Sequence, residues 1–193
     1  MKGTALPALA ITCLLAGCSR PAYDCAQPAT QELARRNYAS RLDGFVDQSL
    51  YGVVRAMMRD AQVQRSAEAA SRFDALDSKS IDPRQVALVN VRSIRQLTDR
   101  SSGTSYDCRA TVQLRMPPTD LALEPMDQEL IRQHGIAYDG NMLTHEILFS
   151  SSLDEQGEPS VNVKIPTEAG GLLGMLIPRL ENWESLLQEP AAR

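Results

Sequence analysis

Few side chains in this chain are suited to catalysis or metal binding, because it has only two histidines and four cysteines. His145 is followed by Glu146, but no second histidine follows at helical spacing, so the zinc-protease pattern is absent. His134 precedes Gly135 at a predicted helix end, where a protonated imidazole suits the negative end of the helix dipole. Carboxylates are scattered instead of paired, which gives glycosidase-like acid–base catalysis no support. The sequence therefore predicts no catalytic residue, no metal site and no cofactor.

The beginning of the chain has the layout of a secretory signal. Lys2 supplies a positive charge, residues 5–15 form a short apolar run, and small residues lead into Cys18. The run is too short to span a bilayer, which takes about 20 apolar residues. We therefore predict that residues 1–17 are removed from the mature protein.

The string Leu15-Ala16-Gly17-Cys18 resembles the lipobox of bacterial lipoproteins. In that family the cysteine thiol is diacylated, the signal is cut just before it, and the new amino terminus is usually acylated too. The resemblance implies that Cys18 anchors the protein to a membrane of the cell envelope, since each buried CH₂ contributes about 0.8 kcal/mol. In such lipoproteins an aspartate after the lipidated cysteine tends to retain the protein at the inner membrane. Ser19 stands there in this chain, which favours the periplasmic face of the outer membrane.

The remaining cysteines predict one disulfide. Cys13 is lost with the signal, and with Cys18 lipidated only Cys25 and Cys108 keep a thiol. An exported protein lies in an oxidising compartment, where such a pair normally forms a disulfide. The alternative, a reactive or metal-binding thiol, would need nearby histidines or a close Cys-x-x-Cys, and the sequence has neither. Closing so long a loop would contribute on the order of 4 kcal/mol.

The composition is that of one globular domain on a tether. Hydrophobic residues make up 43% of the 193 residues and charged residues 23%, which is ordinary for a globular protein. The net charge of −4 and the lack of a basic block argue against nucleic acid as a partner. We predict a lipidated tether over residues 18–29 and a single domain over residues 30–193. The oligomeric state is left open by the sequence.

A long helix is predicted at the start of the domain. Apolar residues recur at the 3.6-residue period from residue 31 to the low 60s, with Thr30 as the N-cap. These apolar positions are Leu42, Phe45, Val46, Leu50, Val53, Val54, Met57 and Met58. Residues 62–76 either continue this helix or form a second one.

The hydrophobic period changes to two after a break at Asp82 and the proline that follows it. Over residues 106–116 apolar and polar side chains alternate, which is typical of a half-buried antiparallel strand. Residues 85–97 are the predicted hairpin partner. Cys108 falls on the inward face, so a disulfide to Cys25 would join helix to sheet.

The second half of the domain adds further elements. A short helix is predicted over residues 127–133, an extended segment over 136–150, and a strand around residues 161–165. The uncharged run 170–177 is predicted to be a buried segment that closes the open end of the sheet. An exposed contact surface is the alternative for this run. A short amphipathic helix is predicted over residues 180–187.

Together these elements predict an α+β fold: a long N-terminal helix packed on an antiparallel β-meander, with a short C-terminal helix. This order of elements resembles the cystatin-like or nuclear-transport-factor-2-like plan, in which a sheet curls around a helix, and the resemblance covers roughly residues 30–165. The strand Tyr106-Asp107-Cys108-Arg109-Ala110 is also similar to one in small bacterial lipoproteins, where the pattern implies a disulfide and no catalytic site.

These features favour a non-enzymatic, lipid-anchored envelope protein that binds or scaffolds another periplasmic or outer-membrane component. The alternative is a lipid-anchored pocket protein that binds a small molecule, or a degenerate enzyme of the same plan. A concave sheet face lined with polar groups would favour this alternative. A solid apolar interior would favour the binding module.

Overall fold

The computed structural model describes residues 23–49, 52, 74–75, 79–99, 103–117, 123 and 125–181. Within them the chain combines α-helices with one antiparallel sheet, so the predicted α+β class is confirmed. The elements in chain order are α1 (Pro28–Asp47), the 3-10 helix η2 (Pro83–Gln85), β1 (Val86–Asp99), β2 (Gly103–Arg115), α4 (Pro125–Gln133), β3 (Ala137–Asp139), β4 (Met142–Leu153), β5 (Pro159–Lys164) and α5 (Thr167–Leu180).

Strand β4 organises the five-stranded sheet. The order is β1-β2-β4, and the other side of β4 is shared by β3 and β5. β3 pairs with residues 142–144 at the start of β4, and β5 pairs with residues 148–153 in its second half. The hairpin that the sequence predicts from residues 85–97 and 106–116 is present as β1 and β2.

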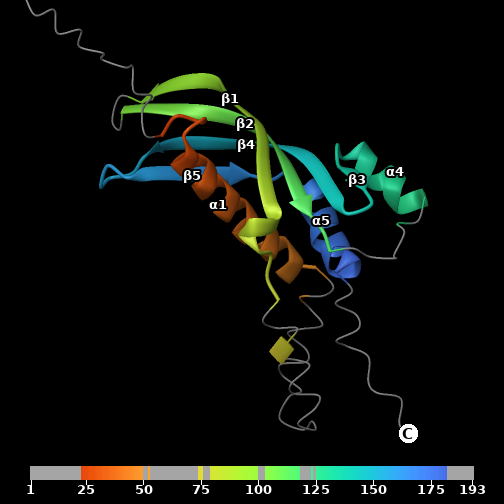
Figure 1. Ribbon diagram of the computed structural model, residues 1–193. Helices are drawn as coiled ribbons and strands as arrows, with labels where there is room; N and C mark the ends of the chain where they lie inside the picture. The colour runs from red at the N-terminus through yellow and green to blue at the C-terminus, as the bar shows by residue number, and fades with distance from the viewer. Residues whose placement is uncertain are drawn as a thin grey trace, which may run out of the picture.

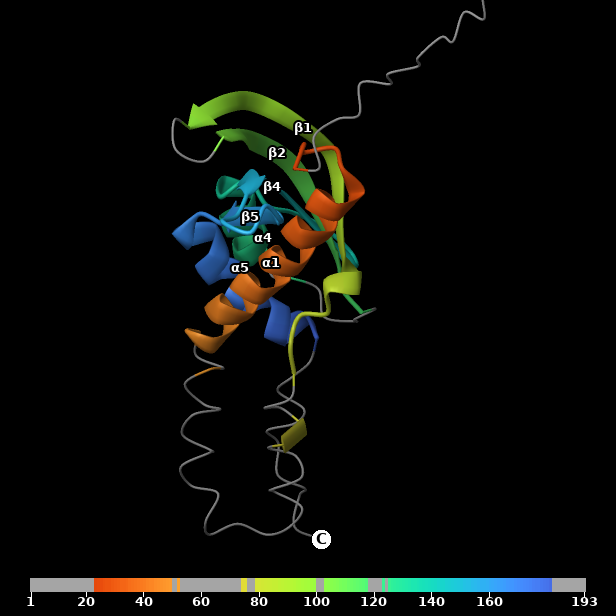
Figure 2. The same cartoon turned by 90° about the vertical axis from the view of Figure 1, so that its left-hand side faces the viewer.

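The two faces of the sheet have different surroundings. α1 and α5 both lie beneath the same face, and β1 and β2 arch over α1 (Figures 1 and 2). We call this covered side the inner face; its buried apolar side chains on β2, β4 and β5 are Cys108, Ala110, Val112, Leu114, Leu143, Ile147, Phe149, Val161 and Val163. The opposite side, which we call the outer face, carries the intervening residues, because successive side chains of a strand point to opposite faces. The predicted alternation along residues 106–116 is therefore confirmed.

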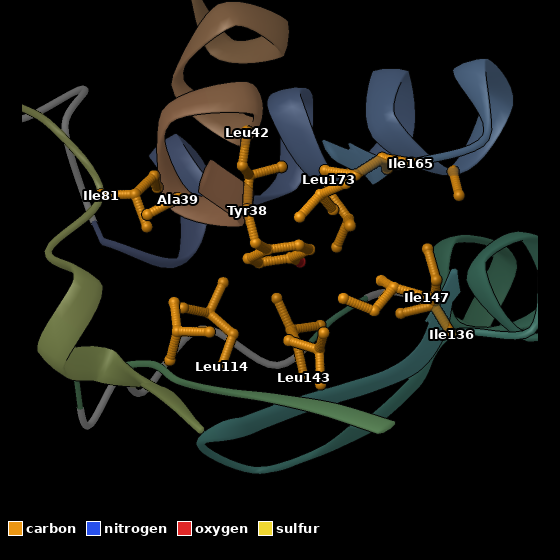
Figure 3. Close-up of a cluster of buried hydrophobic side chains, with 14 of the residues drawn as sticks. Tyr38, Ala39, Leu42, Ile81, Leu114, Ile136, Leu143, Ile147, Ile165 and Leu173 are labelled. Carbon is orange, nitrogen blue, oxygen red and sulfur yellow. The ribbon is translucent and has the colours of Figure 1, made fainter. Parts of the chain in front are cut away.

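The core lies between α1, α5 and the inner face. Figure 3 shows Tyr38 below Leu42 of the same helix, with Leu173 of α5 to one side and Leu114 and Leu143 of the sheet beneath the ring. All five side chains are almost completely buried. Burying side chains of this size stabilises the fold by about 1.5–3 kcal/mol each.

Helix α1 begins earlier than predicted. Its N-cap is Gln27, and Pro28 occupies the first helical position. A proline suits that position because its missing N–H would have no partner within the helix and its φ is already helical. Thr30 therefore lies inside the helix, buried, and the prediction that it caps the helix is wrong.

Helix α1 also ends earlier than predicted. It stops at Asp47, so the helix predicted into the low 60s is interrupted at residues 48–49; residue 52 is helical, and residues 50–51 and 53–61 lie outside the described residues. The backbone N–H and the hydroxyl of Ser49 both donate to the carbonyl of Val46, an arrangement that competes with continued helical bonding. Residues 74–75 are helical; the rest of the 62–76 segment lies outside the described residues.

The segment before α1 is fixed to the sheet by the predicted disulfide. Cys25 is buried and bonded to Cys108 on the inner face of β2, with an S–S distance of 1.99 Å. The ring centroids of Tyr23 and Tyr106 lie 5.8 Å apart. The described end of the predicted tether thus packs on the domain, whereas the predicted signal and Cys18 lie outside the described residues.

The last described helix, α5, lies earlier in the chain than the helix predicted over residues 180–187. α5 includes the uncharged run 170–177, which is helical, and the predicted helix over 180–187 lies outside the described residues beyond residue 181. Leu173 and Ile177 are fully buried, so the interpretation of this run as a buried segment is confirmed. Met175 is 47% exposed and marks the solvent side of α5.

Two glycines allow α5 to pack closely on α1. A Cβ added to Gly170 would collide with the ring of Phe45, and one added to Gly174 would lie 2.6 Å from the backbone oxygen of Phe45. A Cβ on Gly171 would meet nothing within 4 Å. The run therefore packs against α1, which explains why it is rich in glycine although it is helical.

Helix α4 confirms the prediction made for residues 127–133, with two further residues at its start. It ends where Gly135 adopts a φ of 70°, with the N–H of Gly135 bonded to the carbonyl of Arg132 and that of Ile136 to Ile131. These two bonds form a Schellman motif, which satisfies carbonyls at the helix end. No helix in the described part of the chain is both long enough and apolar enough to cross a membrane.

Candidate functional site

One polar pair is buried on the inner face. The Tyr38 hydroxyl of α1 lies 2.7 Å from Nε2 of His145 on β4, and Nδ1 of His145 lies 3.2 Å from the backbone oxygen of Glu146. A carbonyl oxygen can only accept, so Nδ1 carries the proton and Nε2 accepts from the tyrosine hydroxyl. Both polar atoms of the imidazole are therefore satisfied inside the core.

Burial keeps this pair neutral. Removal from water lowers the pKa of His145, opposed in part by its bond to the Glu146 backbone, and raises the pKa of Tyr38. The pair joins α1 to β4 through two groups that hold their protons in place. Its geometry supports a structural role for His145. The described residues contain no group of three histidine, cysteine or acidic side chains that could hold a metal ion.

A hollow lies on the outer face, where β1, β2 and β4 run side by side. Its volume is about 450 Å³, within the range of about 300–1,000 Å³ typical of small-ligand sites. The lining residues are Asn90, Val91, Arg92, Arg109, Ala110, Thr111 and Glu146. All three strands contribute to it, so the pairing of the sheet fixes their backbones.

A β-bulge shapes one side of this hollow. Asn90 and Val91 of β1 stand opposite a single residue of β2, Ala110, because the register shifts between Val89 and Arg92. Asn90 has a φ of 54°, in the left-handed region that asparagine tolerates better than most residues other than glycine. Such a bulge bends the strand and re-aims side chains, and bulges are frequent beside functional sites.

Two arginines face each other directly after the bulge. Arg92 of β1 is the register partner of Arg109 of β2, and like charges directly opposite each other destabilise a strand pair. Glu146 offers partial compensation: its Oε2 lies 3.8 Å from Nη1 of Arg109, with the two side chains 64% and 40% exposed. Nε of Arg109 is buried and has no hydrogen-bond partner in the described part of the structure. Folding therefore leaves two like charges opposed and Nε of Arg109 without a partner in the described structure.

The outer face around the hollow is positive although the chain as a whole is acidic. Over residues 86–96, 105–115 and 142–153 of β1, β2 and β4, the cations of this face are Arg92, Arg95, Arg109 and Arg115, and its acids are Asp107 and Glu146. The net charge of the chain is −4. The positive charge is thus a local property of this surface.

The candidate residues of the sequence fall in different places. Cys25 and Cys108 come together in the disulfide, and His145 is buried on the inner face. His134 is exposed at the end of α4, at the helix end where the sequence predicts it. None of these residues lines the outer hollow.

The residues that do line the hollow were not predicted from the sequence. A signal was present, because the inward apolar positions of β1 are Val86 and Leu88 and then Val91, a step of three residues instead of two. Asparagine is rare in strands, and Asn90 stands at this step. The broken alternation with an asparagine indicates a bulge. The pattern does not indicate which residue of β2 lies opposite the bulge.

Comparison with known proteins gave no match: the chain matches no protein-family model, no curated protein and no solved structure.

Proposed function

We propose that this chain is a lipid-anchored protein of the bacterial cell envelope whose domain binds a partner without catalysing a reaction. The Leu-Ala-Gly-Cys string that ends at Cys18 supports the anchor, and the disulfide between Cys25 and Cys108 suits an oxidising compartment. Ser19 supports the periplasmic face of the outer membrane over the inner membrane. The fold proposed is the cystatin-like or nuclear-transport-factor-2-like plan, supported by a helix followed by an antiparallel sheet that curves over it.

The apolar packing of the inner face, within the described part of the chain, is the observation that carries the binding role. The inner face of the sheet is lined by apolar side chains in contact with α1 and α5, and its polar pair, Tyr38 and His145, is mutually satisfied. A pocket protein of this plan would need open, polar-lined space between helix and sheet. The hollow with unsatisfied groups lies instead on the outer face, where a partner has access to it. This arrangement favours a binding module over a degenerate enzyme.

Membrane fractionation tests the anchor. We expect Cys18→Ser to release the protein from the membrane fraction or to leave the uncut precursor. The matched control is Cys13→Ser, the same change within the predicted signal, which should fractionate and mature like the wild type. A Cys18→Ser protein that matures and fractionates normally would show that the anchor is wrong. Ser19→Asp should move the protein from the outer to the inner membrane fraction on a density gradient.

Site-specific crosslinking tests the binding face. A photoreactive residue at Leu148, 45% exposed on the outer face of β4, should form an adduct with an envelope component in intact cells. The control position is Met175 on α5, which is 47% exposed and lies on the other side of the sheet. Adducts at Met175 and none at Leu148 would assign binding to the helical side and refute the proposed face.

A further inference from the structure

We propose that the outer hollow binds an oxyanion, a carboxylate or a phosphate group, through Arg92 and Arg109. This inference deepens the proposed function and rests on it in one respect: the anionic group is part of the partner that binds the outer face. The observation that carries it is the direct opposition of two arginines in a hollow of about 450 Å³.

The residues that line the hollow give it a net positive charge. Two guanidinium groups and one carboxylate, Glu146, line the hollow, which leaves it with a net positive charge. Within the described residues Arg92 makes no ion pair, and Arg109 reaches Glu146 at 3.8 Å. A bound oxyanion would lie between the two guanidinium groups, and its attraction to both would offset their mutual repulsion. Guanidinium groups suit this role because their planar donors match the oxygens of carboxylates and phosphates.

Unsatisfied hydrogen bonding is the second step. Nε of Arg109 is buried without a partner in the described structure, and a buried donor left unpaired is costly. Asn90 and Thr111 line the same hollow and bring further hydrogen-bonding groups to it. The site thus offers charge and neutral polar groups together, as a site that orients a charged ligand requires.

Backbone conformation is the third step. The bulge places a non-glycine residue, Asn90, at a positive φ on the rim of the hollow. Conformations of this kind persist where the surroundings fix them, and they cluster at binding sites. A regular strand would avoid this strain. The strained backbone of Asn90, the opposed arginines and the unpaired Nε–H of Arg109 therefore occur together at a place where none of them favours folding.

The acidic character of the whole chain makes the hollow selective. At a net charge of −4 the protein as a whole repels anions, so a general electrostatic attraction does not account for anion binding. Two arginines in one hollow are also too few for the extended basic stripe that follows a nucleic-acid backbone. A single anionic group is the ligand that fits both facts.

Titration calorimetry tests this inference on the full chain, purified in a maltoside detergent that carries no anion of its own. Sodium phosphate and sodium succinate are titrated separately at constant ionic strength set with sodium chloride. We expect saturable binding of at least one of them, and the responding anion identifies the group as phosphate or carboxylate. Failure of both to bind at concentrations on the order of 10 mM would overturn the proposal.

Charge-matched variants make the test specific. Arg92→Gln and Arg109→Gln should each weaken binding by about tenfold or more, because each removes a charge-assisted hydrogen bond. Arg115→Gln is the control, since it removes the same charge from the same face outside the hollow, and it should change affinity less than about twofold. Equal weakening by all three would show general surface charge and overturn the site. Circular dichroism checks that each variant is folded.

The outcome is independent of the anchor. Calorimetry does not use the membrane, so anion binding that depends on Arg92 stands even if Cys18→Ser leaves localisation unchanged. Conversely, a confirmed anchor with no anion binding would retain the proposed function and refute this inference alone.

Discussion

The inner and outer faces of the sheet differ in how their polar groups are satisfied. On the inner face Tyr38 and His145 each donate or accept in a fully buried pair, and the imidazole also bonds to the backbone. On the outer face Arg92 and Arg109 oppose each other, with one long contact to Glu146. The buried pair finds its partners within the fold, as the cost of unsatisfied buried groups requires, whereas Oγ of Ser151, also buried on the inner face, has no partner in the described structure. Groups that folding leaves unmatched in a hollow are therefore the better candidates for binding.

The contact between the two helices also differs from the outer face in how closely its elements pack. α5 approaches α1 so closely that glycines are needed at the contact, whereas β1 departs from regular pairing twice along its length. Close packing leaves little room for change, and a bulged edge strand leaves more. We therefore expect large effects of substitution at the helix contact and small effects at the outer face.

The largest expected effect is that of a charge on the inner side of α5. Leu173→Asp places a carboxylate in the core and removes a fully buried side chain, so we expect a loss of about 4 kcal/mol or more in the free energy of unfolding. Met175→Asp, two residues away and 47% exposed, should change it by less than about 1 kcal/mol. Urea unfolding followed by circular dichroism measures both. Similar losses in the two variants would contradict the assignment of the inner side.

The helix contact gives the next effect. Gly174→Ala should destabilise the protein by about 1–3 kcal/mol, because the new methyl group would lie 2.6 Å from the backbone oxygen of Phe45. Gly171→Ala, in the same helix with nothing within 4 Å, should stabilise it by about 0.5–1 kcal/mol through helix propensity. Opposite signs are expected in thermal or urea unfolding. A stabilising Gly174→Ala would show that the two helices are less closely packed.

The pH dependence of stability tests the buried pair. The pKa of His145 is lowered by burial, so below about pH 6.5 the unfolded chain takes up a proton that the folded chain does not. Stability should therefore fall as the pH drops from 6.5 toward the folded pKa, by at most about 1.4 kcal/mol per pH unit for one proton. His145→Gln should lose this slope between pH 6.5 and 5. His134→Gln, at an exposed position, should keep this slope. A slope that disappears in His134→Gln would show that His134, and not His145, causes the pH dependence.

The smallest effect is expected on the outer face, and its sign is the informative part. Arg92→Gln removes a charge opposite Arg109 and should stabilise the protein by about 0.2–1 kcal/mol at low salt. Arg95→Gln removes a charge opposite Asp107, so it should be neutral or slightly destabilising. In 1 M sodium chloride the difference should shrink, because screening weakens exposed charges. A destabilising Arg92→Gln would mean that the arginine pair already has a partner within the fold.

Local sequence determined most elements of the fold. The alternation over residues 106–116 identified β2 and its inward face, and the apolar period of 3.6 identified α1 from residue 31 to its end at Asp47. The pairing of Cys25 with Cys108 followed from removing the other two cysteines from the count. These features rest on residues close together in the chain, or on simple counting, so they could be predicted without the fold. The string before Cys18 is likewise read from the sequence alone.

Tertiary structure decided what depends on contacts between distant segments. Three glycines make residues 170–177 a poor helix by intrinsic propensity, yet α5 forms there because Gly170 and Gly174 fit against Phe45. The opposition of Arg92 and Arg109 depends on the register of the hairpin after the bulge, and one shifted residue would send these side chains to different neighbours. Propensity and periodicity are local quantities, whereas helix–helix fit and strand register are fixed only when the whole domain packs.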